Sequence, residues 1–303
     1  MNRLSMEKRA QIVMALIEGN SVRSTCRMTG AAKGTVLKLI ADLGKACAQY
    51  HDENVRNVRA RRVQCDEVWS FCYGKDKNLS DEQKGDGAGS VWTWTALDAD
   101  SKLIVSYLCG GRDASWGMAF MEDLASRVST RIQITTDGHR VYADAVEGAF
   151  GMNVDYAMLI KMYGSPAVQD TRYSPGEVIG IETKVMCGNP DKRHISTSYV
   201  ERQNLTMRMS MRRFTRLTNA FSKKLANHEH MLAIYFMYYN FCRVHQTLRV
   251  TPAMETGLMN HVWSVEELVN LMEPKSILDG LECFAPLLNA CERNIRARRF
   301  SKP

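Results

Sequence analysis

The sequence lacks paired cysteines, a long apolar run and a recognisable secretion signal. Its nine cysteines stand at irregular spacing with no CxxC pair, which excludes the common zinc sites and a disulfide framework. No apolar run reaches the length that crosses a membrane, and the first residues, MNRLSMEKRAQ, do not have the pattern of a secretion signal. We therefore expect a soluble cytoplasmic protein with reduced thiols and no membrane partner.

Positive charge is in excess and is unevenly distributed. The chain of 303 residues is long enough for two or three domains and carries a formal net charge of +7. Its arginines and lysines gather at 56–62, 208–224 and 293–302. Separate basic clusters indicate a polyanionic partner, most simply nucleic acid.

The first 47 residues predict three short helices. Apolar residues recur at helical spacing in 4–18, a second helix follows at 21–29, and a third begins near Ala32. Gly30 forms the turn between the last two, as in a helix-turn-helix. We predict a small all-α helix-turn-helix domain over 1–47, with a plain three-helix bundle used for packing or dimerisation as the alternative.

In a helix-turn-helix, the helix from Ala32 would enter the major groove of DNA. Lys33, Thr35 and Lys38 are then the residues expected to contact the DNA. Residues 48–62 are polar and arginine-rich without apolar periodicity. We interpret them as a basic linker that can also lie along a DNA backbone.

From residue 63 onwards the pattern favours strands. Segments rich in β-branched and aromatic residues predict five strands, at 62–74, 91–100, 102–111, 131–137 and 154–163. Helices are predicted at 114–129, after Gly138 and again near Glu201. The resulting order, βββαβαβα, is that of an α/β ribonuclease H-like fold, a mixed sheet flanked by helices on both sides.

We assign this ribonuclease H-like domain to residues 63–248. Within it, 163–195 shows no clear periodicity and is interpreted as an insertion before the last helix. Residues 249–303 are predicted to form a C-terminal helical region and a basic tail.

Two acids occupy strand positions where carboxylates need a partner or a ligand. Asp66 lies within an apolar strand, where burying a charge is costly. Asp137 lies where a strand ends, which is where ligands bind in α/β sheets. Asp137 is also explained by an ordinary Asp-Gly turn. Glu67 competes with Asp66, because alternation places adjacent side chains on opposite faces and neither face is clearly the buried one.

A third acid begins a basic helix. Glu201 lies three residues after Ser198, the spacing of a capping box. On a helix, Glu201, Asn204, Arg208 and Arg212 share one side. An acid followed by arginines is the pattern expected if the acid holds a metal and the arginines bind phosphates. The alternative is a capped basic surface helix.

Together, Asp66, Asp137 and Glu201 make a chemically sensible metal site. Two divalent cations held by carboxylates can cut and join phosphodiester bonds. Because Mg²⁺ and Mn²⁺ prefer oxygen ligands, two such ions need no histidine or cysteine. We expect these three acids to be both the metal ligands and the catalytic residues.

Four blocks of the sequence resemble the transposases of the insertion sequence one family. They are CDEVWSF at 65–71, TTDGHRVY at 135–142, STSYVERQNLTMRM at 196–209 and YNFCRVHQTLRVTPAMETGL at 239–258. The resemblance implies a DDE transposase with a ribonuclease H-like core and a triad of Asp66, Asp137 and Glu201, in preference to Glu67. It also implies Mg²⁺ or Mn²⁺, and double-stranded DNA as partner, both at the element ends and at the target. Joining two ends requires a pair of subunits, so we expect a homo-oligomer associated with the nucleoid.

The resemblance does not settle the role of several residues. The last block implies that Arg243 or His245 contacts phosphate near the acids, although a packed helix end explains it equally well. Several members of that family carry a cysteine-rich zinc finger, which this sequence does not contain. We therefore expect end recognition to depend on residues 1–47 and the linker.

Trp69, Trp92 and Trp94 could stack on flipped bases, although aromatic residues in strands more often belong to the core. Two other functions remain possible from the sequence. One is a ribonuclease H-like nuclease that cuts without joining, and the other is a catalytically inactive DNA-binding regulator.

Overall fold

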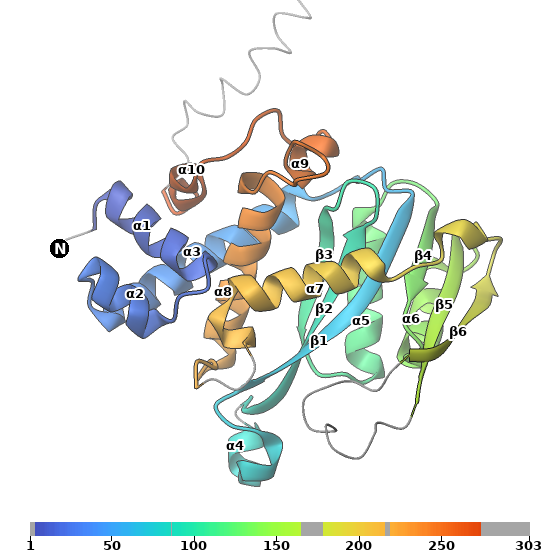
Figure 1. The fold of residues 1–303 in the computed structure, drawn as a ribbon, viewed down its shortest axis with the longest axis horizontal. Coiled ribbons are helices and arrows are strands. Elements are labelled where there is room, and N and C mark those ends of the chain that lie inside the picture. The colour runs from blue at the N-terminus through green and yellow to red at the C-terminus, as the bar shows by residue number, and fades with distance from the viewer. Residues whose placement is uncertain (1–3, 86, 165–177, 216–218, 274–303) are drawn as a thin grey trace, which may run out of the picture.

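The computed structural model describes residues 4–85, 87–164, 178–215 and 219–273. Within them, a six-stranded mixed sheet lies between two layers of helices (Figure 1). The strands are β1 (Arg62–Cys72), β2 (Gly89–Asp98), β3 (Ile104–Gly110), β4 (Ile132–Thr136), β5 (Val154–Tyr163) and β6 (Val178–Cys187). The predicted α/β class and mixed sheet are therefore confirmed.

The sheet has the strand order β3-β2-β1-β4-β5-β6. β1, β2 and β3 form an antiparallel meander, β4 and β5 run parallel to β1, and β6 is antiparallel to β5. The first five strands have the arrangement expected of a ribonuclease H-like sheet. This topology brings the middle of β1 beside the end of β4, where the acids lie.

Helices cover both faces of the sheet. On one face lie α5 (Ala114–Arg127) and α6 (Val141–Phe150), and on the other lies α7 (Ser198–Ser210), which crosses β1 and β2 (Figure 1). The short elements of the β1–β2 connection are η1 (Asp76–Asn78) and α4 (Asp81–Gly85). Trp94 on β2 is fully buried against Phe120 of α5 and Tyr142 of α6.

The remaining helices pack mainly against one another, around α3 and α8. They are α1 (Met6–Ile17), α2 (Val22–Thr29), α3 (Lys33–Asn54), α8 (Leu225–Met237), α9 (Pro252–Glu255) and α10 (Val265–Asn270), with short turns η2 (Lys192–His194), η3 (Arg212–Phe214) and η4 (Tyr238–Cys242). Gly30 ends α2 with a φ of 70°, a left-handed conformation that glycine adopts without strain. Three N-terminal helices are thus present, and their use as a helix-turn-helix stays a prediction.

One sequence interpretation is wrong, because residues 48–54, assigned to the linker, are the last turns of α3. Most of them are exposed, and the one buried member, His51, has its Nε2 3.3 Å from the carbonyl oxygen of Ile104. Within the segment interpreted as an insertion, residues 178–187 form β6, a strand that the sequence did not predict. That strand lies at the edge of the sheet and is largely exposed, so no alternation of buried and exposed residues marks it.

The N-terminal helices are not separated from the sheet by a solvated linker. One continuous apolar core extends from Ile12 of α1, through Leu43 of α3, to Ile134 of β4 and Val269 of α10. The predicted boundary at residue 47 falls inside α3, which packs along α8. No helix in the described part of the chain is both long and apolar enough to cross a membrane. The predicted basic tail lies outside the described residues.

Candidate metal centre

Asp66 lies in the middle of β1 and is largely buried. Its Oδ2 accepts a 2.7 Å hydrogen bond from the side-chain amide of Asn204 on α7. Burial, followed by repulsion from Asp137, raises the pKa of Asp66 to about 6. As the sequence predicts, Asn204 lies on the same face of α7 as Glu201. Its hydrogen bond to Asp66 could not be predicted, because the two residues are 138 positions apart in the chain.

Asp137 follows the last residue of β4 and closes a tight turn. Its Oδ1 accepts a 2.9 Å hydrogen bond from the backbone N–H of His139. The imidazole Nδ1 of His139 in turn accepts from the backbone N–H of Val141 at 3.2 Å. Asp137 can therefore both form the Asp-Gly turn and act as a ligand, because one of its oxygens accepts the turn hydrogen bond while the carboxylate still lines the pocket.

Glu201 lies in the first turn of α7 and faces the sheet. Its Oε1 accepts hydrogen bonds from the Thr197 hydroxyl, at 2.5 Å, and from the ammonium group of Lys161 on β5. The predicted capping box is wrong: Thr197 is the N-cap, and its side chain makes no capping hydrogen bond. The carboxylate lines the pocket, and it contacts its N-cap residue through the Thr197 hydroxyl, which donates to it.

The three acids line one open pocket with a volume of about 530 Å³. Side-chain oxygens of Asp66, Glu67 and Asp137 lie within 4.8 Å of one another. Glu201 lines the same pocket and contributes to raising the pKa of Asp66. The pocket thus collects carboxylates from a central strand, a strand end and a helix.

Glu67 also belongs to this cluster, although alternation suggested that only one of the two neighbouring acids would reach it. Its side chain is 1% exposed and its Oε2 accepts a 3.2 Å hydrogen bond from Arg112. Its Oε1 is buried without a hydrogen-bond partner. Burial, followed by repulsion from Asp137, raises the pKa of Glu67 to about 7.

Arg112 was not identified from the sequence. It lies between β3 and α5, lines the acidic pocket, and holds its guanidinium 4.3 Å from the ring centre of Trp92. A lone arginine after Gly-Gly carries no periodic signal, so only the folded chain reveals that it faces the acids.

The donor set fits divalent cations. Asp66, Asp137 and Glu201 line the pocket with Glu67 close beside them, and burial, followed by repulsion from Asp137, raises the pKa of both Asp66 and Glu67. Hard cations such as Mg²⁺ and Mn²⁺ relieve such repulsion through oxygen ligands. Asp66, Glu67 and Asp137 are the acids whose oxygens lie close enough together to share an ion, and a ligand set of Asp66, Asp137 and Glu201 stays a prediction.

The residues predicted to contact DNA lie in three separate places. Lys33, Thr35 and Lys38 are exposed at the start of α3, where Lys38 pairs with Asp42 at 2.9 Å. These three are accessible to a partner, and contact with DNA stays a prediction.

The basic ladder after Glu201 is shorter than predicted. α7 ends at Ser210, so Arg208 belongs to it and the exposed Arg212 belongs to the following turn η3. Arg213 points inward, where it donates to the Ser222 hydroxyl at 2.8 Å. The helical face therefore carries Arg208 but not Arg212.

Arg243 and His245 do not line the acidic pocket. Burial, followed by the nearby charges of Lys102 and Arg243, lowers the pKa of His245. Lys102 lies over the ring of Tyr199, 3.3 Å from its centre. Arg243 and His245 therefore lie with Lys102 near the start of α7, and their contact with phosphate stays a prediction.

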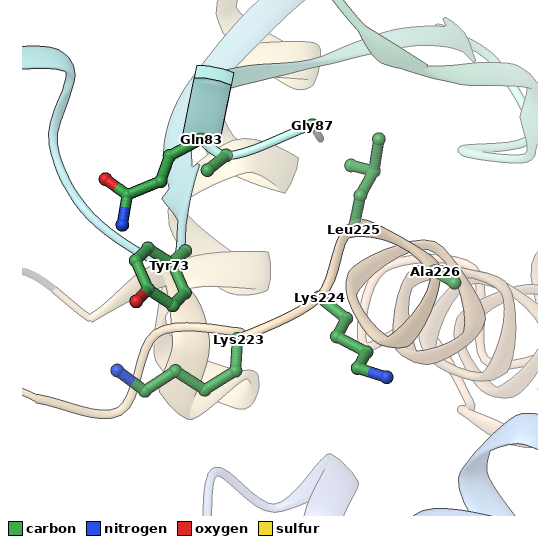
Figure 2. A pocket seen from close by; sticks show the side chains of 8 residues that line it. Tyr73, Gln83, Gly87, Lys223, Lys224, Leu225 and Ala226 are labelled. Carbon is green, nitrogen blue, oxygen red and sulfur yellow. The ribbon is translucent and has the colours of Figure 1, made fainter. Parts of the chain in front are cut away.

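A second pocket, of about 520 Å³, lies beyond the end of β1. Figure 2 shows Tyr73 and Lys223 on one side of it, with Lys224 pointing the other way. Gln83, Gly87 and Leu225 complete the wall. The described residues that line this pocket include no acid, which distinguishes them from the lining of the acidic pocket.

No protein-family model matches the chain, and no curated protein matches its sequence. Among solved structures, the piggyBac transposase in its cryo-EM synaptic complex with hairpin DNA is similar over 90% of this chain and 71% of that chain, with a TM-score of 0.41 and 11% identity. Function therefore has to be inferred from the side chains themselves.

Proposed function

We propose that this chain is a DNA transposase that cleaves DNA at the ends of a mobile element and joins them to target DNA. The observation that carries the proposal is the meeting of Asp66, Asp137 and Glu201 in one open pocket. Acids from three distant segments, held close enough to raise the pKa of Asp66, are costly unless a ligand compensates them. The four sequence blocks that resemble insertion sequence one transposases are the reason to propose DNA cleavage and joining as the reaction.

The side chains have separable tasks. Asn204 holds the Asp66 carboxylate, and the turn at Asp137 fixes the second carboxylate against the same pocket. Lys161 and Thr197 orient Glu201. Bound Mg²⁺ or Mn²⁺ would neutralise the phosphate and activate the attacking oxygen. Alignment of the phosphodiester by these groups and by basic residues such as Arg208 supplies the rest of the rate.

The test is Asp137→Asn in the full chain. We expect metal-dependent cleavage of end-containing DNA to fall by about 100-fold or more, while DNA binding measured by fluorescence anisotropy is retained. Asp144→Asn is the matched control, because Asp144 is exposed on α6 and outside the pocket. Undiminished cleavage by Asp137→Asn in Mg²⁺ would show that the acids are not catalytic.

The same experiment separates the alternatives. Joined products in a strand-transfer assay support a transposase, whereas cleaved products alone indicate a nuclease. DNA binding without any metal-dependent turnover by the wild-type chain indicates a regulator. Element-end recognition by Lys33, Thr35 and Lys38, and assembly into a homo-oligomer, are parts of the proposal that the acid variants do not address.

A further inference from the structure

An aromatic stripe runs along β1 away from the acidic pocket. Alternation places Glu67, Trp69 and Phe71 on the same face of β1, and Tyr73 follows the strand's last residue, with Lys223 lying over both its ring and that of Phe221. Nearer the pocket, that face is covered, because Trp94, the cross-strand partner of Glu67, is buried under α5 and α6. Further along, Trp69 is 38% exposed and Tyr73 is 47% exposed. Aromatic residues in a strand usually fill a core, so this uncovered row requires another explanation.

Neighbouring segments widen the stripe on both sides. Trp92 of β2 is the direct partner of Trp69. On the other edge of β1, Cys72 bridges to Ser222, which brings Phe221 against Phe71 with ring centres 4.8 Å apart. The aromatic stripe therefore consists of Trp92, Trp69, Phe71, Phe221 and Tyr73.

The stripe is held in place by polar contacts. The indole N–H of Trp69 donates to the Ser90 hydroxyl at 2.9 Å. Tyr73 has a φ of 66°, which is rare for a bulky residue, and its backbone N–H donates to the carbonyl of Ser222 at 2.8 Å. These contacts fix the orientation of exposed rings, which lowers the entropic cost of binding a ligand on them.

Cations lie over the aromatic faces along the whole stripe. Arg112 lies 4.3 Å from the ring centre of Trp92, and Lys223 lies 4.3 Å from that of Phe221 and 5.5 Å from that of Tyr73. Lys75 lies 6.0 Å from the ring centre of Phe71. Figure 2 shows the Tyr73 end, where Lys223 runs alongside the ring. Exposed rings interleaved with cations form the surface on which unpaired nucleotides bind, since bases stack on rings and phosphates pair with cations.

Arg112 connects the stripe to the acidic pocket. It contacts Trp92 at one end of the stripe, lines the pocket with Asp66 and Asp137, and is anchored by Glu67. A DNA strand bound along the stripe would therefore pass basic side chains before it reaches the acids. A second protein chain would not need this row of cations.

We propose that the aromatic stripe binds an unpaired DNA strand beside the acidic pocket, with bases stacked on Trp69 and Tyr73 and phosphates bound by Arg112 and Lys223. The proposal rests on the function proposed above and adds the form of DNA that the site takes: a strand separated from its complement next to the position of cleavage. Glu67 is a positioning residue in this arrangement, because it holds Arg112.

The test measures affinity for a fluorescein-labelled single-stranded oligonucleotide of about 12 nucleotides, by anisotropy in EDTA, with the full chain. Trp69→Ala and Tyr73→Ala should each weaken binding by about 5- to 100-fold, the usual loss for one stacked base. Trp69→Phe and Tyr73→Phe should retain most of the affinity. Lys223→Gln should reduce the slope of log affinity against log salt by about 0.7.

Met152→Ala is the control. Met152 is a large apolar residue, 80% exposed, that follows α6 and lies outside the stripe and both pockets. The affinity of this variant should equal that of the wild type, and thermal denaturation should show that all variants are folded.

Three outcomes would overturn the proposal. The first is that Trp69→Ala and Tyr73→Ala both bind the single strand as tightly as the wild type. The second is that they lose as much affinity for a fully paired duplex as for the single strand. The third is that sedimentation shows an oligomer of the wild type that dissociates in the alanine variants. The last would assign the stripe to a second copy of the chain. Loss of single-strand binding in the stripe variants, combined with no cleavage by the wild type, would overturn the proposed function and leave the stripe intact.

Discussion

The folded protein without metal favours the protonated form of Asp66 more than the unfolded chain does. Its pKa is raised from a usual value of 3.8 to about 6 by burial and by Asp137. Between those values the native state binds more protons than the unfolded state, so the free energy of unfolding falls as the pH rises through this window. The cost is fully present above pH 6, at the pH where a metal-dependent enzyme works.

Replacing Asp66 with asparagine should therefore stabilise the metal-free protein. At pH 7.5 in EDTA we expect the free energy of unfolding to rise by on the order of 1–2 kcal/mol, measured by urea denaturation. The gain should shrink toward pH 4, where the wild-type carboxyl is protonated. Added Mg²⁺ should stabilise the wild type more than Asp66→Asn. No gain at pH 7.5 would mean that Asp66 is not electrostatically strained.

At the scale of elements, helix α3 has two glycines in opposite environments. A Cβ on Gly44 would lie 2.4 Å from the Cβ of His230 on α8, whereas a Cβ on Gly34 meets nothing within 4 Å. The absence of a side chain at Gly44 is what allows α3 and α8 to pack closely. At Gly34 it only weakens the first turn of α3.

Alanine at the two positions should have opposite effects. Gly44→Ala should lower the free energy of unfolding by about 1–3 kcal/mol, because backbone atoms of α8 must move. Gly34→Ala should raise it by up to about 1 kcal/mol. Urea denaturation of both variants measures the difference, and equal effects would contradict the close approach of the two helices.

At the scale of the whole molecule, the N-terminal helices share their core with the sheet. The apolar core is continuous from α1 to α10, and Arg9 of α1 pairs with Glu273 at 2.8 Å. Any movement of α1–α3 on binding DNA would have to involve α8 as well. The N-terminal helices and the sheet are therefore parts of one apolar core.

The chain should consequently unfold in a single transition. Four of the five tryptophans lie on β1, β2 and α5, and Trp263 packs against Tyr50 near the end of α3, so their fluorescence reports mainly the sheet, while far-UV circular dichroism also reports all of α1–α3. We expect the two thermal transitions to coincide. An earlier loss of helical signal would show that residues 1–47 unfold on their own.

The sequence by itself determined five of the strands, and together with the family resemblance it named Asp66, Asp137 and Glu201 as candidate acids. Alternation and helical spacing depend on neighbouring residues, so β1 to β5 and their order could be predicted locally. The position of Asp137 at a strand end followed from the Gly turn after it.

Only the tertiary structure decided which side chains surround those acids. Asn204, Arg112 and Lys161 reach the pocket through contacts between residues 40 to 138 positions apart, and such contacts depend on how the layers pack. The exposed edge strand β6 and the polar end of α3 were missed for the same reason. Their partners are distant in the sequence, so no local period records them.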